Sequence, residues 1–127
     1  MAYEQYNPNP KGSRVGDCTV RAISKALDKS WEASFAGLTA KAYELCDMPS
    51  SNTVWGAYLR DYGFVRDIIP MECPDCYTVA DFSRDHPQGT FVLALRGHVL
   101  TVRDGTIFDS WDSSQELPLY YWHKKED

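Results

Sequence analysis

Three short runs with the alternating pattern of β-strands follow one another at residues 90–112. They read TFVLALRG, HVLTVRDG and TIFDSWD, and Asp104-Gly105 joins the last two. An Asp-Gly pair between alternating apolar residues is the strongest short-range signal of a β-hairpin. The sequence therefore predicts a small antiparallel sheet in this part of the chain, with its register set by the Asp104-Gly105 turn.

The predicted register brings chemically useful side chains to one face of the hairpin. If the turn has two residues, Leu100 lies opposite Asp109. Because side chains alternate between faces along a strand, His98 shares the face of Leu100 and becomes a diagonal neighbour of Asp109. Trp111, opposite His98, falls on this face too. The pattern predicts a contact between His98 and Asp109 that Trp111 shields from water.

Apolar residues at helical spacing dominate the first half of the chain, with Asp17, Ser30 and Thr78 as predicted N-caps. Helices followed by an antiparallel sheet indicate an α+β fold, with the N-terminal helices packed on a small sheet. At 127 residues the chain is expected to be a single domain, 1–127, whose residues 1–16 form an extended arm or loop. The predicted helices are 17–27, 31–45, 53–63 and 78–85.

Charge and hydropathy argue against several classes of protein. The formal net charge is -5, whereas a nucleic-acid binder normally presents a basic surface. The longest apolar run, FVLAL, is far shorter than the ~20 residues that cross a bilayer, and the polar N-terminus lacks the core of a secretory signal. We expect a cytoplasmic protein with no nucleic-acid or membrane partner. Its four cysteines are then more often reduced, catalytic or metal-bound than paired in disulfides.

Cys18 stands where a loop-like stretch, RVGDC, becomes the helical stretch TVRAISKAL. At the start of a helix the backbone N–H groups and the helix dipole favour thiolate over thiol. A nucleophilic thiol also needs an imidazole that accepts its proton and a third polar group that orients the imidazole. His98 and Asp109 fit these two roles. The alternative, that Cys18 is only a small buried residue of the helix, stays open from its position alone.

The blocks NPNPKGSRVGDCTVRAISKAL and GHVLTVRDGTIFDSWDS resemble a group of small, uncharacterised papain-like proteins of bacteria and bacteriophages. In papain-like cysteine peptidases a nucleophilic Cys opens the first long helix, and a small sheet bears first a His and then an Asp. The resemblance implies a papain-like fold with Cys18 as nucleophile, His98 as base and Asp109 as orienting residue. It implies no metal and no organic cofactor.

The residues that would hold the oxyanion are less plainly marked. Papain-like enzymes usually carry a Gln a few residues before the Cys, and here the only upstream glutamine is Gln5. The side-chain amide would then come from Asn7 or Asn9, of which we favour Asn7, with the nucleophile's own backbone N–H as second donor. Asp17 and Trp111 complete the predicted substrate-binding residues. Without an amide in reach, turnover would fall by about 10²–10³.

A second cysteine pattern, CPDC, contains Cys73 and Cys76. A pair at this spacing can supply half of a tetrahedral zinc site, which needs four ligands. Cys46 and His86 could complete such a site, although no second half is recognisable in the sequence. A redox pair and a structural or incidental pair are the other interpretations. Cys73 and Cys76 are therefore secondary zinc candidates.

Together these residues predict a cysteine-dependent hydrolase that cleaves a peptide or isopeptide bond through a Cys-His-Asp triad and a thioester intermediate. One alternative is a cysteine acyltransferase, which uses the same triad. Another is a catalytically retired papain-like protein that acts as a binding factor, for example a phage-encoded one directed against a host protein or small molecule. The expected partner is a peptide or protein substrate, or a host protein target. The sequence does not define an oligomeric state.

Overall fold

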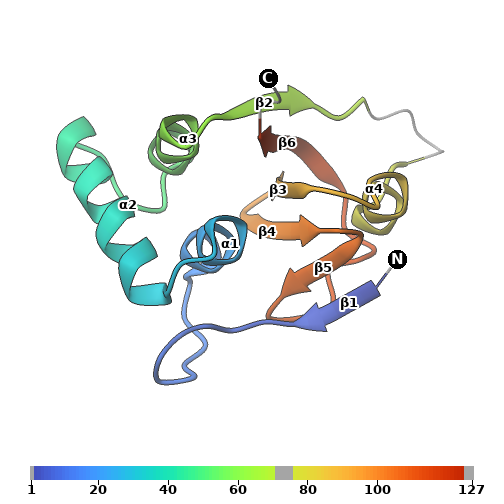
Figure 1. The fold of residues 1–127 in the computed structure, drawn as a ribbon, viewed down its shortest axis with the longest axis horizontal. Coiled ribbons are helices and arrows are strands. Elements are labelled where there is room, and N and C mark those ends of the chain that lie inside the picture. Colours follow the sequence, from blue (N-terminus) through green and yellow to red (C-terminus); the bar gives the residue numbers. More distant parts are fainter. Residues whose placement is uncertain (1, 71–75, 125–127) are drawn as a thin grey trace.

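The computed structural model describes residues 2–70 and 76–124, which form an α+β fold as predicted. Six strands build one mixed sheet in the order β1-β5-β4-β3-β6-β2. Helices α1 to α3 lie on one side of the sheet, and α4 packs on the other (Figure 1). The elements are β1 (Ala2–Gln5), α1 (Cys18–Leu27), α2 (Trp31–Leu45), α3 (Asn52–Asp61), β2 (Phe64–Ile68), α4 (Val79–Asp85), β3 (Thr90–Leu95), β4 (His98–Arg103), β5 (Thr106–Asp109) and β6 (Pro118–Lys124).

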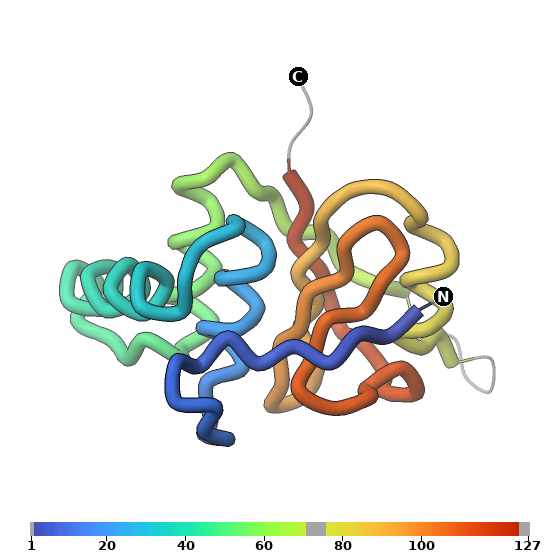
Figure 2. The backbone as a smooth tube through the Cα atoms, turned by 60° about the horizontal axis from the view of Figure 1, so that its bottom comes forward, coloured from blue at the N-terminus to red at the C-terminus, as the bar shows by residue number. Residues whose placement is uncertain are grey.

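The sheet is mixed rather than antiparallel, which corrects the predictions for the sheet and for the N-terminal arm. Residues Ala2–Gln5 form an edge strand that pairs in parallel with β5. The backbone N–H of Tyr6 donates to the carbonyl oxygen of Asp109 at 2.7 Å and continues this pairing. Only residues 6–17 form the loop that leads back to α1, as the blue segment in Figure 2 shows. The pairing with the edge strand β1 holds the backbone of Asp109 in place.

The predicted hairpin of β4 and β5 is confirmed. Arg103 lies opposite Thr106, so the turn consists of Asp104 and Gly105, with φ of 50° and 77°. Glycine adopts positive φ readily and aspartate tolerates it, which explains this pair at this place. The register therefore matches the prediction.

Two apolar cores lie on the two faces of the sheet, because successive residues of a strand point to opposite faces. On β3, Val92 packs in the core beneath α1, α2 and α3, whereas Leu93 packs in the core beneath α4. Both side chains are completely buried. The central strands β3, β4 and β6 are therefore covered on both sides.

Helix α1 runs beside β4 in the same direction. Thr101 Oγ1 donates to the carbonyl oxygen of Ala22 at 2.7 Å, and one turn further on Arg103 Nη2 donates to the carbonyl oxygen of Lys25 at 2.6 Å. These two hydrogen bonds hold α1 at a defined position along β4. The first residue of the helix consequently lies beside the first residue of the strand.

Two of the three predicted N-caps are confirmed. Ser30 Oγ accepts from the N–H of Ala33 at 3.1 Å, and Thr78 forms a reciprocal capping box with Asp81. Asp17 occupies the N-cap position of α1, but its side chain makes no capping hydrogen bond. The prediction of a capping role for Asp17 is therefore wrong, and its carboxylate has other partners, described below.

Helix α2 is only partly covered by the rest of the protein. The helical spacing predicts that Phe35 and Leu45 face inward, but they are 45% and 40% exposed, while Leu38 is completely buried. The reason is that α2 packs on α1 and α3, away from the sheet (Figure 1). None of the helices in the described residues, α2 included, combines the length and apolar character that crossing a membrane requires.

Candidate active site

Cys18 and His98 interact through a hydrogen bond and through charge where α1 and β4 begin side by side. His98 Nε2 donates to Asp109 Oδ2 at 2.7 Å, which leaves Nδ1 as the ring nitrogen that shares a proton with the thiol. The backbone N–H of Val99 also donates to the sulfur. The structure thus brings together the three residues predicted to be catalytic.

Asp109 is buried, with 2% of its surface exposed, and both of its oxygens have partners. Oδ2 accepts from His98 and from Ser113 Oγ, the latter at 2.6 Å. Oδ1 accepts from the backbone N–H of Ser110 at 2.8 Å and faces Arg21 Nη2 at 3.7 Å. A carboxylate held from four directions cannot rotate freely, so it fixes the plane of the imidazole ring.

The surroundings shift the protonation equilibria of the thiol and the imidazole in opposite directions. Burial acts to raise the pKa of Cys18, but the hydrogen bond and charge of His98, the N–H of Val99 and the charge of Arg21 outweigh it and lower the pKa from 9.0. Burial acts to lower the pKa of His98, but its hydrogen bonds to Asp109 and Cys18 raise it from 6.5 to about 9. Both shifts favour a thiolate–imidazolium pair.

Arg21 belongs to this site, although the sequence analysis did not single it out. It is only 8% exposed, and its guanidinium lies between the carboxylates of Asp17 and Asp109. Asp17 Oδ2 in turn accepts from Trp31 Nε1 at 2.9 Å. The sequence contained one signal of this ion pair, because Asp17 and Arg21 stand four residues apart, the spacing at which side chains meet on a helix. Asp17 therefore holds Arg21, and it does not line the pocket around Cys18.

A hollow of about 290 Å³, here named the Cys18 pocket, opens above the thiol. The ring of Trp111 lies 5.3 Å from that of His98, centroid to centroid, and Trp111 is 45% exposed. It therefore covers part of the imidazole while staying within reach of a ligand. The walls come from the loop before α1, from α1, and from the sheet end, and include Asn7, Arg14, Cys18, Arg21, His98 and Trp111.

The predicted amide donor, Asn7, lines the pocket but is engaged within its own loop. Its Nδ2 donates to the carbonyl oxygens of Ser13 at 3.2 Å and of Gly12 at 3.5 Å. The amide protons therefore stabilise the loop and do not point to a ligand in this conformation. By contrast, the described residues offer no acceptor to the backbone N–H of Cys18, since Asp17 does not cap α1. This N–H is the available oxyanion donor.

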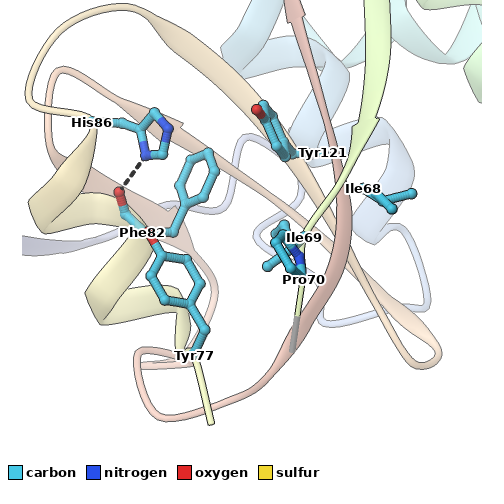
Figure 3. Close-up of a pocket in the computed structure, with 7 residues that line it drawn as sticks. All are labelled: Ile68, Ile69, Pro70, Tyr77, Phe82, His86 and Tyr121. Atoms are coloured by element: carbon cyan, nitrogen blue, oxygen red, sulfur yellow. Dashed lines mark hydrogen bonds between the residues drawn. The ribbon is translucent and has the colours of Figure 1, made fainter. Parts of the chain in front are cut away.

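A second hollow, of about 300 Å³, lies beside α4 on the opposite face of the sheet (Figure 3). It is lined mainly by aliphatic and aromatic side chains, and its described lining contains no thiol or carboxylate. His86 stacks on Phe82 at 3.8 Å, and its Nδ1 lies 2.8 Å from the carbonyl oxygen of Phe82. His86 thus ends α4 and does not take part in the Cys18 site.

The other cysteines that the structure describes, Cys46 and Cys76, do not line the Cys18 pocket. Cys18 and Cys46 are free thiols, whereas Cys76 is disulfide-bonded, so the expectation of reduced or metal-bound cysteines is wrong for Cys76. A disulfide sulfur is not the thiolate that zinc binds. Cys73, the other zinc candidate, lies outside the described residues. Within the described residues no group of three or more His, Cys, Asp or Glu side chains is arranged to hold a metal ion.

No protein-family model, curated protein sequence or solved structure matches this chain. The papain-like relationship is therefore an expectation carried by two sequence blocks. The function has to be inferred from the chemistry of the Cys18 site.

Proposed function

We propose that the protein is a cysteine-dependent hydrolase of amide bonds, built on a papain-like fold. Cys18 is the nucleophile, His98 moves the proton and Asp109 orients the ring. The observation that carries the proposal is the connected set of contacts from the Cys18 thiol through His98 to the buried Asp109, with the pKa of the thiol lowered. A nucleophile next to a base, with the base held by a third group, is the diagnostic arrangement of covalent catalysis.

The proposed reaction has two stages. Cys18 Sγ attacks the carbonyl carbon, a C–S bond forms, and the resulting oxyanion lies beside the backbone N–H of Cys18. Collapse breaks the C–N bond as His98 gives its proton to the leaving amine, and a thioester remains. Water then attacks the thioester while His98 accepts a proton from it. A second collapse breaks the C–S bond, releases the acid and restores the thiolate–imidazolium pair.

The buried charges around Asp109 support an active site over a retired one. Breaking a buried ion pair leaves an uncompensated charge, whereas apolar residues of similar volume often pack equally well. The buried charges here are those of Asp17, Arg21 and Asp109, and they lie next to a thiol of lowered pKa. Perturbed pKa values beside buried charges are typical of catalytic sites. The engaged amide of Asn7 is the observation that favours the alternative, a binding protein without turnover.

An acylation assay with p-nitrophenyl acetate tests the proposal. The wild-type protein is expected to release a burst of nitrophenol and to carry an acetyl group on Cys18, identified by peptide mass spectrometry. Cys18→Ser should lose both the burst and the label. Cys46→Ser is the matched control, because it removes the other free thiol and should keep both. Absence of acetylation at an intact, free Cys18 would contradict the proposal.

The same assay separates a hydrolase from an acyltransferase, since both form the thioester. In a hydrolase, water resolves the acyl-enzyme, and added glycine amide should leave the steady-state rate unchanged. If the rate rises in proportion to the amine and acetylated glycine amide accumulates, the protein is an acyltransferase. An acetyl group that stays on Cys18 under both conditions would indicate the retired alternative.

A further inference from the structure

Cationic side chains line the Cys18 pocket of this acidic protein. The chain has a formal net charge of -5. The pocket, however, is lined by Arg14, Arg21 and His98, and its described lining contains no Asp or Glu. Three acids adjoin pocket residues in the sequence, namely Asp17, Asp109 and Asp112. Asp17 and Asp109 pair with Arg21 and His98, and Asp112 Oδ1 accepts from a backbone N–H. Arg14 is therefore the cation of the described lining whose charge no ion pair compensates.

The described cations that lack a partner belong to segments that line this pocket or adjoin it. Among the described lysines and arginines, only the side chains of Lys11, Arg14 and Arg96 lack an ion pair, a hydrogen bond and an aromatic contact. Arg14 lines the pocket, Lys11 belongs to the same loop, and Arg96 precedes the pocket residue Gly97. All three side chains are exposed. The cations that do have partners are Arg21, Arg60, Arg66, Arg84, Arg103, Lys25, Lys29, Lys41 and Lys124.

Arg14 and Arg21 differ in whether their guanidinium groups are available to bind a ligand. The guanidinium of Arg21 is buried between Asp17 and Asp109, which together neutralise it. Arg14 makes no ion pair with a described carboxylate and is exposed on the loop before α1. It is therefore the pocket cation whose guanidinium is open to a ligand.

We infer that the substrate is an acidic peptide that presents a carboxylate to Arg14 while its amide lies at Cys18. A guanidinium binds a carboxylate through two parallel hydrogen bonds, and the neighbouring charges of Lys11 and Arg96 attract an anionic ligand. This inference rests on the proposed function in one respect, namely that Cys18 is the reacting group. The carboxylate can belong to an acidic side chain or to a free C-terminus, and the experiments below separate these sources.

The first test compares alkylation of Cys18 by iodoacetate and by iodoacetamide. The two reagents react with thiolate in the same way and differ by a carboxylate against a neutral amide. Cys46, a free and exposed thiol, serves as the reference within the same molecule. We expect the iodoacetate-to-iodoacetamide rate ratio to be about threefold to tenfold higher at Cys18 than at Cys46 at low salt, the size expected for exposed charges in a high dielectric. The difference should shrink as salt screens the charges.

Variants show which cation is responsible. Arg14→Gln should lower the rate ratio at Cys18 about threefold and leave the iodoacetamide rate unchanged. Arg14→Lys, which keeps the charge, should retain most of the ratio. Arg84→Gln is the matched control, since it removes the same charge from α4, on the other face of the sheet. Equal ratios at Cys18 and Cys46, or a ratio at Cys18 that Arg14→Gln leaves unchanged, would overturn the inference.

The experiments distinguish failure of this inference from failure of the proposed function. Failure of the proposed function appears as an iodoacetamide reaction at Cys18 that does not depend on His98, whereas failure of this inference appears only in the reagent ratio. Two pairs of peptide substrates then identify the source of the carboxylate: Glu against Gln beside the scissile bond, and a free C-terminus against a C-terminal amide. The pair whose preference Arg14→Gln abolishes identifies the source. No preference in either pair would overturn the inference.

Discussion

Arg21 Nη2 lies 3.7 Å from Oδ1 of Asp109, whose other oxygen accepts the hydrogen bond of His98. Arg21 stands three residues after Cys18 on α1, whereas Asp109 ends β5. This pair therefore connects the helix that carries the thiol to the strand that orients the imidazole. It couples the stability of the fold to the geometry of the site.

Replacement of Arg21 is expected to destabilise the protein strongly. Arg21→Gln should lower the free energy of unfolding by about 3–5 kcal/mol, because the buried carboxylates of Asp17 and Asp109 lose their shared partner. Urea unfolding measures the change. Arg84→Gln, which breaks exposed pairs on α4, should cost less than about 1 kcal/mol. A loss for Arg21→Gln as small as that of the control would mean that the buried network contributes little.

Removal of the Asp109 charge is expected to change the titration of His98. In the wild type the pKa of His98 is about 9. Asp109→Asn removes an opposite charge in contact with the ring and should lower this pKa by about 1–3 units. NMR titration of the imidazole measures the shift. Asp112→Asn is the control, because that carboxylate is bonded to the N–H of Ser114, and an equal shift in both variants would contradict the assignment.

The opposite pKa shifts of Cys18 and His98 predict that their contributions to the pH dependence of wild-type stability partly cancel. The folded pKa of His98, about 9, exceeds 6.5, so its proton stabilises the fold below pH 6.5 and this contribution is lost as the pH rises through 9. The depressed pKa of Cys18 contributes stability above 9.0 that is lost as the pH falls through the folded value. Between the folded pKa of Cys18 and 9, the two contributions oppose each other.

Cys18→Ser should expose the contribution of His98 alone, because Asp109 still raises the pKa of the ring. The stability of this variant should fall as the pH rises from about 6.5 toward 9. The slope should lie below the limit of about 1.4 kcal/mol per pH unit for one proton, since solvent reaches the imidazole. Urea unfolding at several pH values compares it with the wild type. Equally flat profiles for both proteins would contradict a raised pKa of His98.

The part of the site that the sequence predicted is the part fixed by short-range structure. The Asp104-Gly105 turn sets the register of the hairpin, and the register alone brings His98 toward Asp109. The start of α1 follows from the apolar spacing after Cys18. These relationships span few residues, so turn chemistry and side-chain periodicity are sufficient to find them.

The parts that the sequence did not predict depend on contacts between distant segments. Parallel pairing of Ala2–Gln5 with β5 has no local signal, because a parallel edge strand needs no turn. The N-cap role of Asp17 is displaced by Arg21 and Trp31, which compete for its carboxylate. Phe35 remains half-exposed because α2 packs mainly on its neighbouring helices α1 and α3. In each case tertiary contacts override a local preference.

Asn7→Ala tests whether the loop amide takes part in turnover. Because Asn7 Nδ2 donates to the carbonyl oxygens of Gly12 and Ser13, the variant should loosen the loop before α1 and increase its cleavage in limited proteolysis. Acylation of Cys18 by p-nitrophenyl acetate should fall by less than about tenfold. A fall of about 10²–10³ with an intact loop would instead identify Asn7 as an oxyanion donor.

The most direct test of the account is the rate at which iodoacetamide alkylates Cys18 as a function of pH. Mass spectrometry follows each thiol in the wild type and in His98→Ala, with Cys46 as the reference. We expect fast alkylation of Cys18 below pH 7 in the wild type. In His98→Ala the profile should move to that of an ordinary thiol, with a pKa near 8.5, while that of Cys46 stays unchanged. A Cys18 that is inert, or that reacts as an ordinary thiol in the wild type, would contradict the thiolate–imidazolium pair and with it the proposed catalysis.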